Sequence, residues 1–235
     1  MGVVSRRVKS TEGRWADRNA ERQRAVIEAL IELVEESEPR AEISFQDIAN
    51  RAGISRTVLY RHFSDRMDLD NQAREHVVEM YLDAVMPVLD PTETVRETVS
   101  IAVNNYVNLV AEHPRLYQWM ELASHEGFTG STAVISAKDA IARQISSFIT
   151  PIAALLGQTD PGLDVGIFAM VSMIDGAVTR WLRDMPEGWD APGVARMLTD
   201  SFLILLQGHA ALRGVSIDVD VPIDDLVAAA LNRPA

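Results

Sequence analysis

The chain has 235 residues, and its content of 47% hydrophobic and 24% charged residues is ordinary for a globular protein with enough apolar material to fill a core. It contains no cysteine, which excludes disulfides and thiolate metal sites and makes a reducing cytoplasm the natural expectation. No apolar run follows the basic N-terminal residues, and the most apolar stretches are shorter than the ~20 residues that cross a bilayer, so we expect a soluble protein without a signal peptide or membrane span.

The net charge of −12 is unevenly distributed along the chain. Residues 1–76 carry 13 Lys/Arg and 14 Asp/Glu, whereas residues 77–235 carry 9 and 20. The first 24 residues are themselves basic, with seven Lys/Arg against three acidic side chains. A near-neutral head with a basic leading arm, on an acidic body, is compatible with docking on nucleic-acid phosphates and equally with a solvated charged tail.

Apolar residues recur at helical spacing from end to end, and no strand-like alternation is visible, so the sequence predicts an all-α fold. The first helix is predicted at 17–37, where Val26, Leu30 and Val34 lie on one face, and Pro39 ends it. Beyond a pair of short helices that starts at Phe45, further helices are predicted at 65–87, 92–112, 114–125, 131–157, 161–185 and 190–214, with a short one at 223–231.

Capping residues followed by proline mark several of these helix starts. Asp90-Pro91, with Glu93 placed to complete a capping box, and Asp190 are two examples. The helix at 65–87 is expected to link head to body without a flexible linker. We therefore predict two domains, at 1–66 and 67–235.

Residues 44–63 have the layout of a helix-turn-helix. Ser44 can cap the first helix, with Asp47 completing a capping box. Gly53 supplies the positive φ that ends this helix in a tight turn, and Ser55 can cap the second helix.

The two helices of the motif together have an inward apolar face and an outward polar surface. One inward face is predicted from the spacing of Ile48, Ala52, Val58, Leu59 and Phe63. The outward candidates are Arg56, Thr57, Tyr60, Arg61 and His62. Arginine can pair with guanine in the major groove and a threonine methyl can touch thymine, while tyrosine and histidine suit phosphate oxygens. The same pattern also fits an ordinary helical hairpin with a polar face.

One run of the chain reads Ile48-Ala49-x-x-Ala52-Gly53-Ile54-Ser55-x-x-x-Leu59-Tyr60-x-His62-Phe63, followed by Asp65-Arg66 and Leu69. This run resembles the DNA-binding signature of TetR-family regulators. The resemblance covers about 50 residues with the first helix, and the helical order and length of the whole chain also fit that family. It implies an N-terminal three-helix helix-turn-helix domain whose second motif helix enters the major groove.

The resemblance also implies which residues contact DNA. By this resemblance, Arg56 and Thr57 contact base edges. The residues that contact phosphates are Ser44, Tyr60, His62 and Arg66. Arg66 occupies a position where the family usually has lysine. Two features depart from the family. Residues 38–42 lack its common loop glycine, and Phe45 stands where a smaller β-branched residue is usual. These two departures concern the shape of the loop and the contact made by Ser44. They do not affect the second helix of the motif.

Behind this head, the resemblance implies a helical C-terminal regulatory and dimerisation domain whose last two long helices form the dimer. The interface candidates on these helices are Ile174, Val178, Leu198, Phe202 and Leu206. An apolar stripe can equally be intramolecular core. The two-fold geometry of paired half-sites favours the interface, so we expect a homodimer on a pseudo-palindromic operator.

The middle helices are rich in large apolar side chains that suit a small, largely apolar effector. The pocket candidates are Tyr106, Tyr117, Trp119, Met120, Phe148 and Met173, each of which can equally be plain core. Asp175 interrupts the apolar run 168–174, and a buried carboxylate needs a partner. It can orient a ligand, cap the turn at Gly176, or pair with an arginine such as Arg180.

Two other classes of protein compete with this interpretation. The chain has no short histidine pair, phosphate loop, dinucleotide glycine motif or nucleophile elbow, so we expect no enzyme, catalytic residue, cofactor or metal. A protein-interaction adaptor with an inactive head is the other rival, against which the surface of Arg56, Tyr60 and His62 argues. The expected function is a ligand-controlled transcriptional repressor, since repression is the family's commoner mode.

Overall fold

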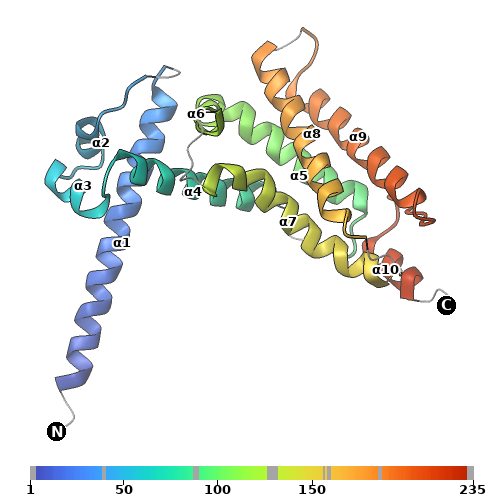
Figure 1. Ribbon diagram of the computed structural model, residues 1–235, viewed down its shortest axis with the longest axis horizontal. Helices are drawn as coiled ribbons and strands as arrows, with labels where there is room; N and C mark the ends of the chain where they lie inside the picture. The colour runs from blue at the N-terminus through green and yellow to red at the C-terminus, as the bar shows by residue number, and fades with distance from the viewer. Residues whose placement is uncertain are drawn as a thin grey trace. The chain divides into compact units, whose positions relative to one another are not determined.

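The computed structural model describes residues 4–38, 41–86, 90–125, 132–155, 157, 160–184 and 187–231. Apart from an isolated bridge between Thr94 and Pro222, these residues form helices and no strand, which confirms the all-α prediction (Figure 1). The helices are α1 (Val4–Glu36), α2 (Phe45–Arg51), α3 (Arg56–His62), α4 (Arg66–Val85), α5 (Val95–Glu112), α6 (Pro114–His125), α7 (Thr132–Leu155), α8 (Leu163–Asp184), α9 (Ala191–Ala211) and α10 (Ile223–Leu231).

The chain divides into two compact units. The first unit comprises Met1–Val77 and Arg115–Val134, and the second comprises Val78–Pro114 and Ile135–Ala235. The division falls within α4, later than the boundary expected after residue 66, and α6 belongs to the first unit. The grouping of α6 with the first unit depends on long-range packing, which a local sequence pattern does not reveal.

The first unit is built around the C-terminal half of α1, which packs against α2, with α3 packed on α2. Its buried apolar side chains include Val26, Leu30, Val34, Ile48, Leu59, Phe63, Leu69 and Ala73. At the surface, Arg51 at the end of α2 forms ion pairs with Glu32 and Glu36 of α1. These contacts hold the two short helices α2 and α3 on a long helical support.

Two arginines attach α6 to the first unit. Arg115 donates from Nη1 to the carbonyl oxygens of Glu35 (3.3 Å) and Ser37 (2.9 Å), which satisfies acceptors that the end of α1 would otherwise leave without an intrahelical partner. Arg74 of α4 lies with its guanidinium 4.4 Å from the ring centroid of Trp119, a cation–π contact. Both contacts are distant along the chain, which explains why the sequence did not place α6 beside the head.

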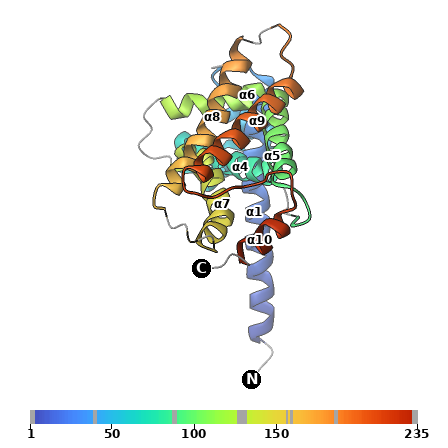
Figure 2. The same ribbon diagram turned by 90° about the vertical axis from the view of Figure 1, so that its right-hand side faces the viewer.

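In the second unit α5 packs against α8 and α9, and α8 runs beside α9 in both views (Figure 1, Figure 2). One buried cluster of this unit consists of Ala142, Ile167, Met170, Val171 and Phe202. The C-terminal segment returns to the start of α5, where the amide of Ile223 donates to the Glu93 carbonyl (3.0 Å) and Arg96 binds Asp220 (2.5 Å).

Within the described part of the chain, α8 is the helix long and apolar enough to cross a membrane by length and composition. Ile167, Met170 and Val178 on this helix are buried in the second unit, and the charged Asp175 lies on the same helix and is buried too. A core helix of a soluble protein passes the same composition test. Helix α8 therefore buries one face in the second unit, while Val165 and Phe168 on the same helix are exposed.

The predicted start of one helix and the predicted cap of another are wrong. Helix α1 begins at Val4 and not at residue 17. Its added turns show no apolar periodicity, but once a helix has formed downstream each further residue adds a hydrogen bond without a new nucleus. Helix α5 begins at Val95, capped by Thr94 with Glu97 completing the box, because Asp90 instead accepts from the Thr92 amide (2.9 Å) in a preceding turn. The other predicted ranges agree to within about three residues at each end.

Candidate nucleic-acid interface

The helix-turn-helix begins with the predicted capping box. The Ser44 hydroxyl accepts from the Asp47 amide (3.2 Å), and the Asp47 carboxylate accepts from the Ser44 amide (3.0 Å) and hydroxyl (2.5 Å). These hydrogen bonds, that from the Ser44 side chain foremost, lower the pKa of Asp47. The Ser44 hydroxyl proton is thus engaged within the protein, so its predicted phosphate contact would require this side chain to exchange partners or the Ser44 amide to take part.

The turn between the two helices is also as predicted. Gly53 has a φ of 66°, in the left-handed region that favours glycine. The Ile54 amide then reaches back to the Ala49 carbonyl (3.0 Å), which closes the first helix. Ser55 caps α3 by accepting from the Val58 amide at 3.3 Å.

Helix α3 has a buried and an exposed face. The buried anchors are Leu59 and Phe63, which lie with Ile48 in the core of the first unit, while Ala52 and Val58 are half-buried. Four of the predicted outward residues are exposed: Arg56, Thr57, Tyr60 and Arg61. The apolar face fixes the helix to its support, so its polar face is presented rigidly to solvent.

An aromatic and cationic cluster covers part of that surface. The Phe45 ring, at the start of α2, lies 5.1 Å from the Tyr60 ring with an interplanar angle of 52°. Arg56 donates from Nη2 to the Tyr60 hydroxyl at 3.2 Å, and its guanidinium lies 5.6 Å from the Tyr60 ring centroid. Sequence reasoning noted Phe45 as unusual but missed this contact, because the two rings come from different helices.

His62 and Arg66 are less exposed than the other candidates. Desolvation, and then the positive charges of Arg22 and Arg61, lower the pKa of His62 below its ordinary value of 6.5. The lowered pKa favours the neutral ring, which can still donate one N–H to a phosphate. Arg66 is bound internally to the Ile43 carbonyl and to Asp70 (2.8 Å), so this side chain also joins α4 to the loop before α2.

The candidates for a ligand pocket fall in both units. Tyr117, Trp119 and Met120 belong to α6 of the first unit, and Tyr106, Phe148, Met173 and Asp175 lie in the second unit. Phe148 is 42% exposed on α7, whereas Tyr106 is buried.

Asp175 has partners that the sequence did not identify. Its buried carboxylate accepts from the Tyr106 hydroxyl at 2.6 Å and pairs with Lys138 of α7. Arg180, the partner suggested by the sequence, instead pairs with Asp184 at 2.7 Å. Asp175 thus joins α5, α7 and α8. Elsewhere among the described residues, no three His, Asp or Glu side chains are grouped closely enough to hold a metal ion.

Most of the dimer candidates are buried within the chain itself. Val178, Leu198 and Phe202 are at most 5% exposed, and Ile174 and Leu206 pack beside the buried cluster of the second unit. The exposed apolar side chains of α8 and α9 are others: Val165, Phe168, Met197, Ile204 and Leu205. Helix α9 is apolar on more than one face, so its spacing alone could not separate core from surface.

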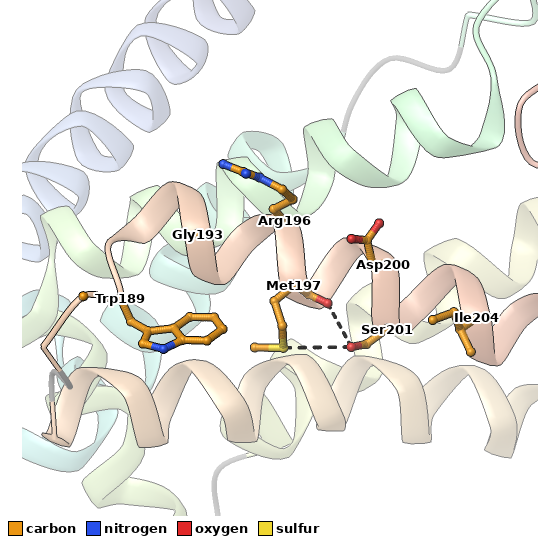
Figure 3. A pocket seen from close by; sticks show the side chains of 8 residues that line it. Trp189, Gly193, Arg196, Met197, Asp200, Ser201 and Ile204 are labelled. Carbon is orange, nitrogen blue, oxygen red and sulfur yellow. Dashed lines mark hydrogen bonds between the residues drawn. The ribbon is translucent and has the colours of Figure 1, made fainter.

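A shallow hollow of about 470 Å³ lies along this exposed side of α9. Figure 3 shows Trp189, Met197 and Ile204 along it, with Arg196 and Asp200 on the upper side of the helix in that view. Ser201 also lines the hollow, and its hydroxyl donates to the Met197 carbonyl at 2.8 Å. The hollow is thus mainly apolar, with a polar edge.

Comparison with known proteins places the interface in a family. The family model described as "Bacterial regulatory proteins, tetR family" matches residues 39–71, which include both helices of the motif. An uncharacterized HTH-type transcriptional regulator of Mycobacterium tuberculosis is 23% identical over 187 residues, covering 77% of this chain and 76% of that protein. The nucleoid occlusion factor SlmA of Vibrio atlanticus is 22% identical over 99 residues, 42% of this chain and half of that protein.

Solved structures share the fold. A tetR-family transcriptional regulator from Streptomyces coelicolor superposes with a TM-score of 0.64 at 21% identity, covering 90% of this chain and 89% of that chain. The fatty acid degradation regulator FadR from Bacillus halodurans has a TM-score of 0.59 at 15% identity, covering 77% and 94%. The similarity in fold extends well beyond the residues of the helix-turn-helix.

Proposed function

The chain belongs to the TetR family of DNA-binding transcriptional regulators, and on that basis we propose that it is a cytoplasmic, homodimeric repressor whose operator binding is controlled by a small, largely apolar effector. We assign it no catalytic activity, since regulators of this family act by binding. Helix α3 is the element that enters the major groove.

The observation that carries DNA recognition is the two-faced α3. Leu59 and Phe63 anchor the helix in the core, while Arg56, Thr57 and Tyr60 are exposed on the opposite side. An arginine here can bind the O6 and N7 atoms of guanine, and a threonine methyl can pack on thymine. Tyr60 and His62 are assigned to phosphates, which set the position of the helix without reading sequence.

Selection of bound fragments from genomic DNA by the purified protein tests this proposal. We expect recovery of a pseudo-palindromic sequence, with an affinity that falls as salt rises because phosphate contacts release counterions. The half-sites should lie one helical turn apart, about 34–36 Å centre to centre. Recovery of fragments without a common sequence would contradict it.

We assign the dimer interface to the exposed apolar side of α8 and α9, and propose a second copy of this chain as its occupant. Phe168 of α8 and Ile204 and Leu205 of α9 are large, exposed apolar side chains, and Ile204 also lines the hollow beside Trp189. Large apolar side chains that gather on exposed helix faces often mark a protein–protein interaction surface. A two-fold axis would place the same patch of both copies face to face and hold two α3 helices for paired half-sites.

The effector is assigned to the helical body. Tyr106 and Met173 supply apolar surface there, and Asp175 with Lys138 supplies a polar anchor. The structural neighbour described as a fatty acid degradation regulator makes long-chain acyl compounds a reasonable first probe. An effector that changes operator affinity 100-fold needs about 2.7 kcal/mol of difference between its affinities for the two states.

A screen of lipophilic compounds with two readouts tests this part of the proposal. A true effector raises the melting temperature and also shifts operator affinity, and Met173→Ala should weaken both effects while ligand-free operator binding is kept. Compounds that stabilise the protein without changing operator affinity would contradict ligand control and leave DNA recognition standing.

A further inference from the structure

We propose that Phe45 is a positioning residue for base recognition: its ring braces Tyr60, and Tyr60 holds Arg56 in the orientation that meets a base edge. The proposal rests on the proposed function, because it requires α3 to read DNA. It concerns a residue of α2 to which neither the resemblance nor the comparisons assign a contact.

The first step is the contact between the two helices. Phe45 is half-buried at the start of α2, and Tyr60 is 49% exposed on α3. A centroid distance of 5.1 Å at a tilt of 52° lies in the favourable range for aromatic pairs. An exposed tyrosine without such a neighbour would sample several rotamers. Phe45 therefore restricts where the Tyr60 hydroxyl lies.

The second step is the contact from Tyr60 to Arg56. The hydroxyl accepts from Arg56 Nη2 at 3.2 Å, and the ring lies under the guanidinium at 5.6 Å. Accepting this bond leaves the phenolic O–H free to donate to a phosphate oxygen. Tyr60 can thus connect a phosphate contact with the side chain that reads the base.

The third step is energetic. A free arginine side chain has many rotamers, and binding a base edge requires one of them. Bidentate recognition also depends on the plane of the guanidinium. Holding Arg56 before DNA arrives lowers the entropy lost on binding and favours the base that matches that orientation. The contacts from Phe45 through Tyr60 to Arg56 should therefore affect base preference as well as affinity.

The cluster is separate from the core that keeps the domain folded. Leu59 and Phe63 are at most 1% exposed and anchor α3 on the opposite face. Phe45→Val keeps an apolar residue at the start of α2 and leaves those anchors in place. A change in base preference in this variant is then attributable to the brace.

The experiment uses the full chain and the operator obtained by genomic selection, with single-base variants at every position of one half-site. In Phe45→Val we expect the preference at the position read by Arg56 to fall roughly three- to tenfold, the effect of one aromatic pair, with the other positions unchanged. Phe45→Tyr keeps the ring and should retain the preference. Leu231→Val, which also shortens an exposed apolar side chain but lies on α10 of the second unit, is the control and should bind as the wild type.

Arg56→Ala should abolish the same preference, and adding Phe45→Val to it should change nothing further. If Phe45→Val fails to fold, Tyr60→Phe replaces it, since that variant keeps the ring and loses the hydroxyl that accepts from Arg56 and donates to a phosphate. It should then lower the preference at that position beyond any uniform loss of affinity. If Phe45→Val, or Tyr60→Phe in its place, keeps the wild-type preference at that position, the inference is overturned and the proposed function stands. If the wild-type protein shows no sequence preference, the proposed function itself is overturned.

Discussion

Ile204→Glu should separate the proposed dimer into folded monomers. Ile204 is 68% exposed on α9, so the isolated chain can accept a glutamate there without disturbing its core. Full burial of an isoleucine side chain stabilises by about 1.5–3 kcal/mol, and covering the exposed two-thirds would contribute about 1–2 kcal/mol. In a two-fold dimer the change occurs twice, which doubles the loss to roughly 2–4 kcal/mol before the cost of desolvating the carboxylates.

A loss of this size weakens the dimer about 30- to 1000-fold. Sedimentation velocity across a concentration series measures the dimer dissociation constant directly, and far-UV circular dichroism checks that helix content persists. Operator affinity should fall in parallel, because a single α3 reads only one half-site.

Leu231→Glu is the matched control. Leu231 lies on α10 at 62% exposure, so the substitution adds the same charge at a similarly exposed leucine off the α8–α9 surface. The control should remain dimeric. The assignment of the interface is refuted if both variants sediment alike, and dimerisation itself is refuted if the wild type is monomeric at micromolar concentration.

Three further predictions concern the interface and the body. Arg56→Ala should cost about 1–3 kcal/mol of operator affinity and relax the preference at one position per half-site, as titrations with single-base variants would show; uniform weakening would mean that Arg56 contacts only phosphate. Burial lowers the pKa of His62 in the folded state, and two nearby arginines lower it further. The unfolded state therefore binds more protons below pH 6.5, and the free energy of unfolding decreases as the pH falls through that value. Urea unfolding from pH 7.5 to 5.5 should therefore show a shallower pH dependence in His62→Gln, and identical slopes would contradict this. Asp175→Asn should destabilise the protein by about 1–3 kcal/mol, because the carboxylate accepts from Tyr106 and pairs with the half-exposed Lys138; an unchanged denaturation midpoint would contradict a structural role for this network.

The parts of the site that the sequence determined are those set by neighbouring residues. The capping box of Ser44 and Asp47, the positive φ of Gly53 and the cap of Ser55 all link residues within a few positions of one another. Such interactions depend on the local backbone, so residue type and spacing identify them. The inward face with Leu59 followed from the same periodicity.

The start of α1 and the placement of α6 show where local reasoning ends. Periodicity detects a helix by the face it buries, so the first turns of α1, without an apolar periodicity, gave no signal. The attachment of α6 to the first unit depends on Arg115 reaching the carbonyls of Glu35 and Ser37, about 80 residues earlier in the chain. No spacing rule connects residues at that separation.

Only the tertiary structure decided which apolar residues are core and which are surface on α9. Leu198 and Phe202 are buried, whereas Ile204 is exposed, although all three are large and apolar on the same helix. For a helix with more than one apolar face, burial depends on where its neighbours lie, which its own sequence does not specify. The pairing of Phe45 with Tyr60 has the same origin, because the turn at Gly53 and the packing of α3 on α2 bring together two rings that are 15 positions apart.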